Sequence, residues 1–231
     1  MKTRFFLLAA LLGLLGTGLY ASGGNDGFGG WGMSAPGYGM GMHGYFGAPP
    51  GSAGPGGSGA ARLAPAKIEE SLKAALARYG NKDWQIAEIM AFEYNDYAEI
   101  SDGDRLLMEL LIDPWTGAVR PEYGPNMMWN TEFSRMGGPM MGRGNPNAPM
   151  TVSETDAVAI ANRWLAAQGS SWATEDHPDR FPGYYTLHTL DNGKITGMLS
   201  VNGYGGQVWF HDWHGAFLGM IGEHADESGG S

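Results

Sequence analysis

His211, Asp212 and His214 place two imidazoles and a carboxylate within four residues of the sequence, and together they could bind a metal ion. Neutral imidazole and carboxylate are ligands that suit zinc or copper(II). Residues three apart on an extended strand point to opposite faces, so the two histidines converge only if the chain turns near Trp213. The alternative is that these side chains pack at the end of a strand, with both histidines hydrogen-bonded.

A third imidazole is expected in the same sheet. Asn192-Gly193 lies between two apolar runs, which predicts a β-hairpin. Pairing through this turn would place His188 opposite Gly197. His188 is therefore a further candidate ligand.

Methionine supplies a second candidate for metal binding. The chain has 14 methionines, several of them in glycine-rich stretches such as that of Met40, Met42 and His43. Soft thioether ligands suit copper(I), so copper is the cofactor that this alternative predicts. The competing interpretation is that methionine is an adaptable filler in these stretches.

The chain repeats itself at an offset of 89 residues. Ile112 to Val119 returns as Val201 to Val208, and Gly80 corresponds to Gly169. An offset that holds for a helix end and for a distant turn indicates a duplicated structural unit.

The histidines are not shared between the two copies. His211 and His214 correspond to Glu122 and Pro125, and His188 corresponds to Glu99. This difference is expected of a site built on one copy, and equally of sequence drift.

Each copy predicts a helix followed by strands. Apolar residues recur at helical spacing before Gly80 and before Gly169, and Ser153 suits a helix N-cap. Alternating and apolar runs then predict three strands in each copy, at 84–94, 105–113 and from 119, and at 184–190, 195–201 and 207–213. The predicted fold class is α+β, with two tandem units, each one helix packed on a three-stranded antiparallel meander.

The turn between the last two predicted strands resembles that of the PepSY-type domain. Ile112-Asp113-Pro114-Trp115-Thr116-Gly117-Ala118-Val119 matches its Asp-x-x-Thr-Gly turn, whereas the second copy has Asn202 in place of Asp and Gly205 in place of Thr. The resemblance covers about 65–124 and 151–218. It implies a binding or inhibitory module without chemistry of its own, and modulation of a peptidase as one version of that role.

Trp115 and Tyr204 occupy matching positions at the two turn tips. A large aromatic residue at a turn tip indicates a contact surface. The contact is either with a protein or peptide partner or between the two copies.

The N-terminus reads as an export signal, with a basic start and an apolar run that is short for a membrane helix. We expect a periplasmic or extracellular protein, with an uncleaved anchor as the alternative and no membrane insertion after cleavage. The predicted segments are a signal peptide (1–21), a Gly/Pro/Met-rich disordered tether (22–62), unit 1 (63–134), a Gly/Met/Pro-rich linker (135–149), unit 2 (150–224) and a disordered acidic tail (225–231).

The composition and the absence of common catalytic motifs exclude several classes of function. The chain has no cysteine, which excludes thiol catalysis and disulfides, and its net charge of −10 argues against a nucleic-acid partner. It has neither His-Glu-x-x-His nor Gly-x-Ser-x-Gly, so no enzymatic activity is expected. The leading prediction is an exported binding module. Metal handling, above all of copper, is the alternative, and surface assembly through the tether is a third possibility.

Overall fold

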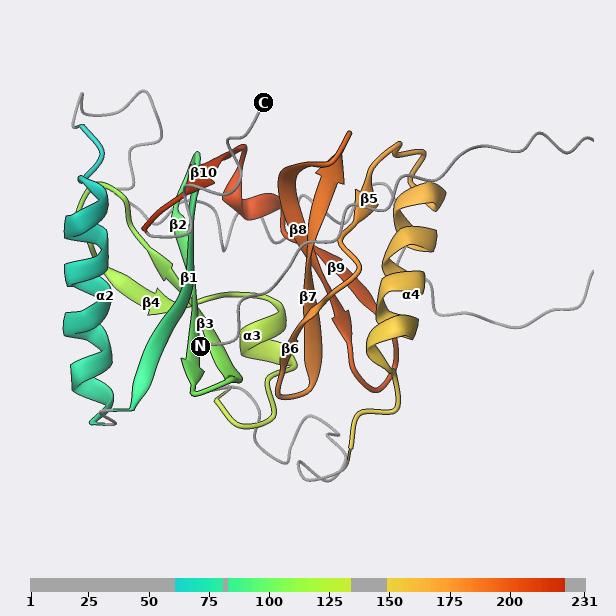
Figure 1. Cartoon of the computed structure of the whole chain (residues 1–231), viewed down its shortest axis with the longest axis horizontal. Helices are drawn as coiled ribbons and strands as arrows, with labels where there is room; N and C mark the ends of the chain where they lie inside the picture. Colours follow the sequence, from blue (N-terminus) through green and yellow to red (C-terminus); the bar gives the residue numbers. More distant parts are fainter. Residues whose placement is uncertain (1–60, 81–82, 134–148, 223–231) are drawn as a thin grey trace, which may run out of the picture. The chain divides into compact units, whose positions relative to one another are not determined.

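Two antiparallel five-stranded sheets form the framework of the computed structural model, which describes residues 61–80, 83–133 and 149–222 (Figure 1). The described residues all belong to the unit that spans residues 39–231. The first sheet has the order β10-β1-β2-β3-β4; the second has the order β5-β7-β8-β9, and β6 also pairs with β7. The strands are β1 (Trp84–Phe92), β2 (Asp96–Asp102), β3 (Arg105–Ile112), β4 (Val119–Pro121), β5 (Ala173–Thr174), β6 (Asp179–Phe181), β7 (Tyr184–Asp191), β8 (Lys194–Asn202), β9 (Val208–Phe210) and β10 (Phe217–Met220).

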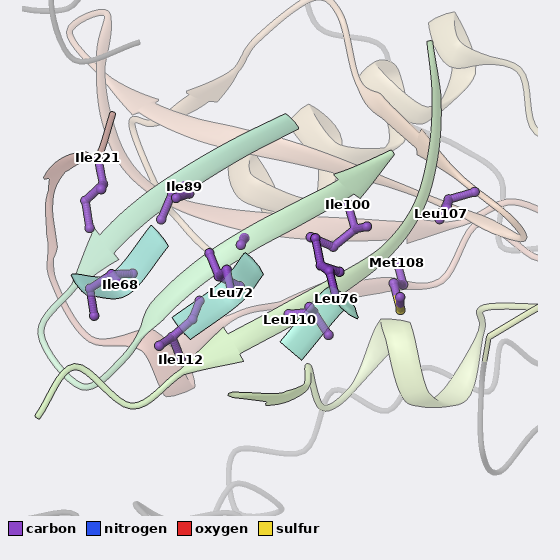
Figure 2. Packing of buried hydrophobic residues seen from close by; sticks show 11 residues of the cluster. Ile68, Leu72, Leu76, Ile89, Ile100, Leu107, Met108, Leu110, Ile112 and Ile221 are labelled. Atoms are coloured by element: carbon purple, nitrogen blue, oxygen red, sulfur yellow. The ribbon is translucent and has the colours of Figure 1, made fainter. Parts of the chain in front are cut away.

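Helix α2 (Pro65–Tyr79) packs on the first sheet. Proline suits its first turn, and the chain leaves it at Gly80 in the left-handed conformation, φ 76°. Its buried residues recur at helical spacing, so one face enters the core. Figure 2 shows this core, in which Ile68, Leu72 and Leu76 of α2 meet Ile89, Ile100, Leu110 and Ile112 of the sheet.

Helix α4 (Glu154–Ala167) packs on the second sheet. The Ser153 hydroxyl accepts a hydrogen bond from the backbone N–H of Asp156, and acidic residues in the first turn suit the positive end of the helix dipole. Its apolar face buries Ala157, Ala161 and Leu165 against Tyr185, Leu187, Leu199 and Val201.

The 89-residue offset recurs in the bounds of individual elements. Strand β4 starts at Val119 and β9 at Val208. In both turns before these strands a side-chain oxygen, of Asp113 or Asn202, accepts two backbone N–H groups. Each turn closes at a left-handed glycine, Gly117 or Gly206.

The predicted fold class is wrong. The structure is mostly β and only 25% helical, and it does not consist of two tandem units of one helix on a three-stranded meander. Strand β10 lies near the end of the chain but pairs with β1, so the first sheet is assembled from both ends of the described chain. Strands β2, β5, β6 and β10 and the short helix α3 (Pro125–Met128) were not predicted.

Two physical reasons account for three of the missed strands, β2, β5 and β6. Strand β2 buries Asp96 and Glu99, and these residue types are depleted in strands, so propensity argued against it. Strands β5 and β6 have two and three residues, which is too short for an alternating pattern to be recognised.

The predicted signal peptide (1–21) and acidic tail (225–231) lie outside the described residues, as do nearly all of the tether (22–62) and the linker (135–149). Their boundaries stay predictions. Within the described ranges, every helix falls short of the length and apolar character that crossing a bilayer requires.

Gly183→Ala is expected to destabilise the fold by about 2–4 kcal/mol. Gly183 has φ 102°, and a Cβ there would lie 2.3 Å from the backbone oxygen of Trp129. Gly169→Ala is the matched control, because Gly169 is also left-handed, φ 74°, but a Cβ there meets nothing within 4 Å. Urea unfolding should show a clearly larger loss for Gly183→Ala; equal losses would contradict the predicted clash.

Candidate metal centre

A single turn of 3₁₀-helix brings His211 and His214 together. Strand β9 ends at Phe210, and the turn η2 (Asp212–His214) follows, with His211 as its N-cap. A 3₁₀-helix has three residues per turn, so residues three apart lie on the same side. The two imidazole rings are 5.6 Å apart between centroids.

Glu122 completes this group from the first sheet. It directly follows β4, and its backbone N–H donates to the carbonyl oxygen of Glu109 at 3.0 Å. Its Oε1 lies 3.2 Å from Nδ1 of His211 and 3.1 Å from Nε2 of His214. Two ligands of one tetrahedral zinc, with bonds of about 2.0–2.1 Å, are roughly 3.3 Å apart. These separations therefore suit a shared ion, and the candidate ligand atoms of the three residues all lie within 4.8 Å of one another.

Asn95, which contacts the His214 ring, determines which ring nitrogen of His214 carries the proton. The Asn95 amide nitrogen donates to the carbonyl oxygen of Trp213 at 3.1 Å, which orients the amide. Its Oδ1, 2.6 Å from Nδ1 of His214, must then accept a hydrogen bond from that nitrogen. Burial, with His211 nearby, holds the pKa of His214 well below its ordinary value, so the ring is neutral and Nε2 presents a lone pair to Glu122.

A second carboxyl, Glu109, is buried beside this group. Its Oε1 accepts hydrogen bonds from the hydroxyls of Tyr97 and Thr186, and its Oε2 accepts from Tyr184, each at 2.7 Å. Burial and the charge of Glu122 raise the pKa of Glu109 well above its ordinary value.

Two polar atoms of the group are buried without a hydrogen-bond partner in the described part of the chain. They are Oε2 of Glu122 and Nδ1 of His211. The latter lies close to Oε1 of Glu122, but the two atoms are not aligned as donor and acceptor. Leaving such an atom unpaired costs about 1–3 kcal/mol, and a bound cation would satisfy both.

Asp212, a predicted ligand, is exposed on η2. The ligand group found within the described residues consists of Glu122, His211 and His214 and does not include it. The other predicted ligands Met40, Met42 and His43 lie outside the described residues.

His188 lies in a different cluster, between two carboxylates. Its Nδ1 is 3.2 Å from Oε2 of Glu175, and its Nε2 is 3.2 Å from Oε1 of Glu88. It faces Met198 rather than Gly197, because an irregularity between Thr189 and Leu190 shifts the register of the hairpin. Burial opposes the charged ring, but the hydrogen bond to Glu175 and the negative charges of Glu175 and Glu88 raise the pKa of His188 well above its ordinary value.

Sequence reasoning did not identify Glu122 as a ligand. A signal was present, because Glu122 and His211 are equivalent positions of the repeat and lie in contact. Likewise Tyr97 and its equivalent Thr186 both donate to Oε1 of Glu109. In both cases, residues at equivalent positions of the two copies lie close together. The repeat therefore carries information about contacts as well as about differences between the copies.

The two turn-tip aromatics have different surroundings. The Trp115 side chain is half-buried, and the guanidinium of Arg62 lies 5.7 Å from the centroid of its ring. Tyr204 is 36% exposed. A contact of these tips with a partner stays a prediction, as does the PepSY-type resemblance. Comparison of the chain with known protein families, with curated proteins and with solved structures found no match.

Proposed function

We propose that this protein binds a divalent transition metal ion, zinc or copper(II), through Glu122, His211 and His214. The observation that carries the proposal is the unpaired Nδ1 of His211 close to the Glu122 carboxylate, which also has an unpaired oxygen. Two imidazole nitrogens and a carboxylate suit zinc and copper(II), whereas calcium and magnesium prefer sites made of oxygen ligands.

The burial of the group supports binding rather than catalysis. Glu122, His211 and His214 are 0%, 3% and 1% exposed. A catalytic zinc keeps a coordination position open to water or substrate, whereas a structural zinc is enclosed by protein. We therefore assign the ion a structural or carrier role, in keeping with the expected absence of enzymatic activity.

Co(II), a spectroscopic stand-in for zinc, is expected to bind the purified protein with one equivalent at this group. Glu122→Gln should weaken binding at least about 100-fold, because loss of residues that only support a ligand already costs 10–100-fold. Titration followed by the visible absorption of Co(II), with competition by Zn(II), measures both affinities.

Two variants serve as controls. Asp212→Asn and His177→Ala alter exposed residues that are not members of the ligand group, and both should retain the parent affinity. Co(II) also avoids the copper(I) sites proposed for the methionine-rich stretches, since it is a poor match for thioether ligands. Unchanged binding in Glu122→Gln would remove the proposal.

A second proposal is binding of a protein or peptide outside the cytoplasm, with peptidase modulation as one version. It rests on the exposure of Tyr204 at a turn tip and on the PepSY-type resemblance of the turns. Capture of partners should fall in a Trp115→Ala, Tyr204→Ala variant, and equal recovery would count against this role.

A further inference from the structure

We infer that Glu109, Thr186 and Ser200 are positioning residues that fix the tautomer of His211, so that Nδ1 presents its lone pair to Glu122. The inference deepens the proposed function and rests on it for its effect on metal affinity. The tautomer itself can be measured in the metal-free protein.

A chain of three buried hydrogen bonds connects Glu109 to His211. Oγ1 of Thr186 lies 2.7 Å from Oε1 of Glu109 and 2.9 Å from Oγ of Ser200. Oγ of Ser200 lies 2.9 Å from Nε2 of His211. All four residues are at most 3% exposed, so water does not compete for these groups.

The hydrogen count sets the direction of this chain. Oε1 of Glu109 accepts from Thr186 at 2.7 Å, and a hydroxyl has one hydrogen to donate. Thr186 therefore accepts from Ser200, and Ser200 in turn accepts from the Nε2–H of His211. A proton on Oε2 of Glu109, the oxygen that faces Tyr184, would leave Oε1 an acceptor and the direction of these hydrogen bonds unchanged.

The direction of these hydrogen bonds decides whether Glu122 faces a lone pair or a proton on Nδ1 of His211. With the proton on Nε2, a neutral His211 ring has its lone pair on Nδ1, 3.2 Å from Oε1 of Glu122. In the reverse direction, Nδ1–H would point at Glu122 and occupy the place of the ion. Hydrogen bonds of this kind to the remote nitrogen are how proteins select the metal-binding nitrogen of histidine.

The two histidines are controlled separately. Asn95 sets the tautomer of His214 and does not belong to the chain from Glu109. A substitution in the hydrogen-bond chain should therefore change the tautomer of His211 alone, and the tautomer of His214 provides an internal control.

Thr186→Val and Thr186→Ser form the matched pair that tests the inference. Valine keeps the shape but frees the Ser200 hydrogen to reach Nε2 of His211, whereas serine retains the hydroxyl. Nitrogen-15 NMR of the imidazoles in the metal-free protein should show Nε2–H at His211 in the parent and in Thr186→Ser. In Thr186→Val the Nδ1–H form should gain population, and Co(II) affinity should fall 10–100-fold.

Nδ1–H at His211 in the parent, or an unchanged tautomer in Thr186→Val, would overturn the inference. Ser200→Ala provides a second test if Thr186→Val fails to fold: Nε2 loses its acceptor, and the preference for Nε2–H should weaken. The tautomer of His211 could shift as expected in the variants while the parent protein does not bind Co(II). This outcome would support the hydrogen-bond chain from Glu109 to His211 and reject the proposed function.

Discussion

Addition of Zn(II) is expected to raise the free energy of unfolding by about 4 kcal/mol when free Zn(II) is a thousand times its Kd. An ion that binds only the folded chain stabilises it by mass action. The ligands here require the folded state, because Glu122 follows β4 of the first sheet and His211 follows β9 of the second. Urea unfolding followed by tryptophan fluorescence, with Zn(II) or with a chelator, measures this increment.

Glu122→Gln is expected to lose nearly all of the Zn(II) increment, whatever its stability with chelator. Asp212→Asn should keep it, since Asp212 is exposed and does not belong to the ligand group. Comparing increments within each variant removes the effect of the substitution on the metal-free protein. The same increment in Glu122→Gln and in the parent would show that the stabilising ion binds elsewhere.

Features set by neighbours in the chain could be predicted from the sequence. The spacing of Ile68, Leu72 and Leu76 predicts the face that α2 buries, and the helix stops at Gly80 as expected. The turn before β4 needs a left-handed residue, and Gly117 supplies one with φ 72°. In each case the determining contacts lie within a few residues.

Features set by distant contacts could not be predicted. Pairing of β10 with β1 depends on residues more than a hundred positions apart, and no local pattern encodes it. The role of Glu122 depends on the 3₁₀ turn that carries His214, 92 residues away. The shifted register at His188 arises from a local irregularity after Thr189, which the Asn192-Gly193 turn alone did not reveal.

The second large effect is expected at His188. The residue lies on β7, with its two ring nitrogens facing Glu88 of β1 and Glu175 after β5. A carboxylate only accepts hydrogen bonds, so Nδ1 donates to Glu175, and the negative charge of Glu88 beside Nε2 favours the cationic ring. Glu175 also accepts the backbone N–H of His188 at 2.8 Å. This cation therefore links a strand of the first sheet to the second sheet.

His188→Leu is expected to cost about 3 kcal/mol in free energy of unfolding, because it leaves two carboxylates without their cation. The value is at the low end for a buried ion pair, since the Glu88 and Glu175 side chains are 22% and 20% exposed. Adding Glu88→Gln and Glu175→Gln to His188→Leu should recover part of the loss. No recovery would assign the loss to packing instead of charge. The free energy of unfolding is measured with chelator present, so that metal binding does not contribute to it.

The pH dependence separates the ionic contribution from packing. The pKa of His188 in the folded protein lies well above the 6.5 of an ordinary imidazole, because the hydrogen bond to Glu175 and the negative charges of Glu175 and Glu88 outweigh burial. Its ionic contribution is therefore complete below pH 6.5 and is lost as the pH rises through the folded-state pKa. Burial also raises the pKa of the neighbouring Glu99, but this residue is present in parent and variant alike. The stability difference between the parent and His188→Leu should thus shrink as pH rises above 6.5, and a difference independent of pH would mean that His188 is not held as a cation.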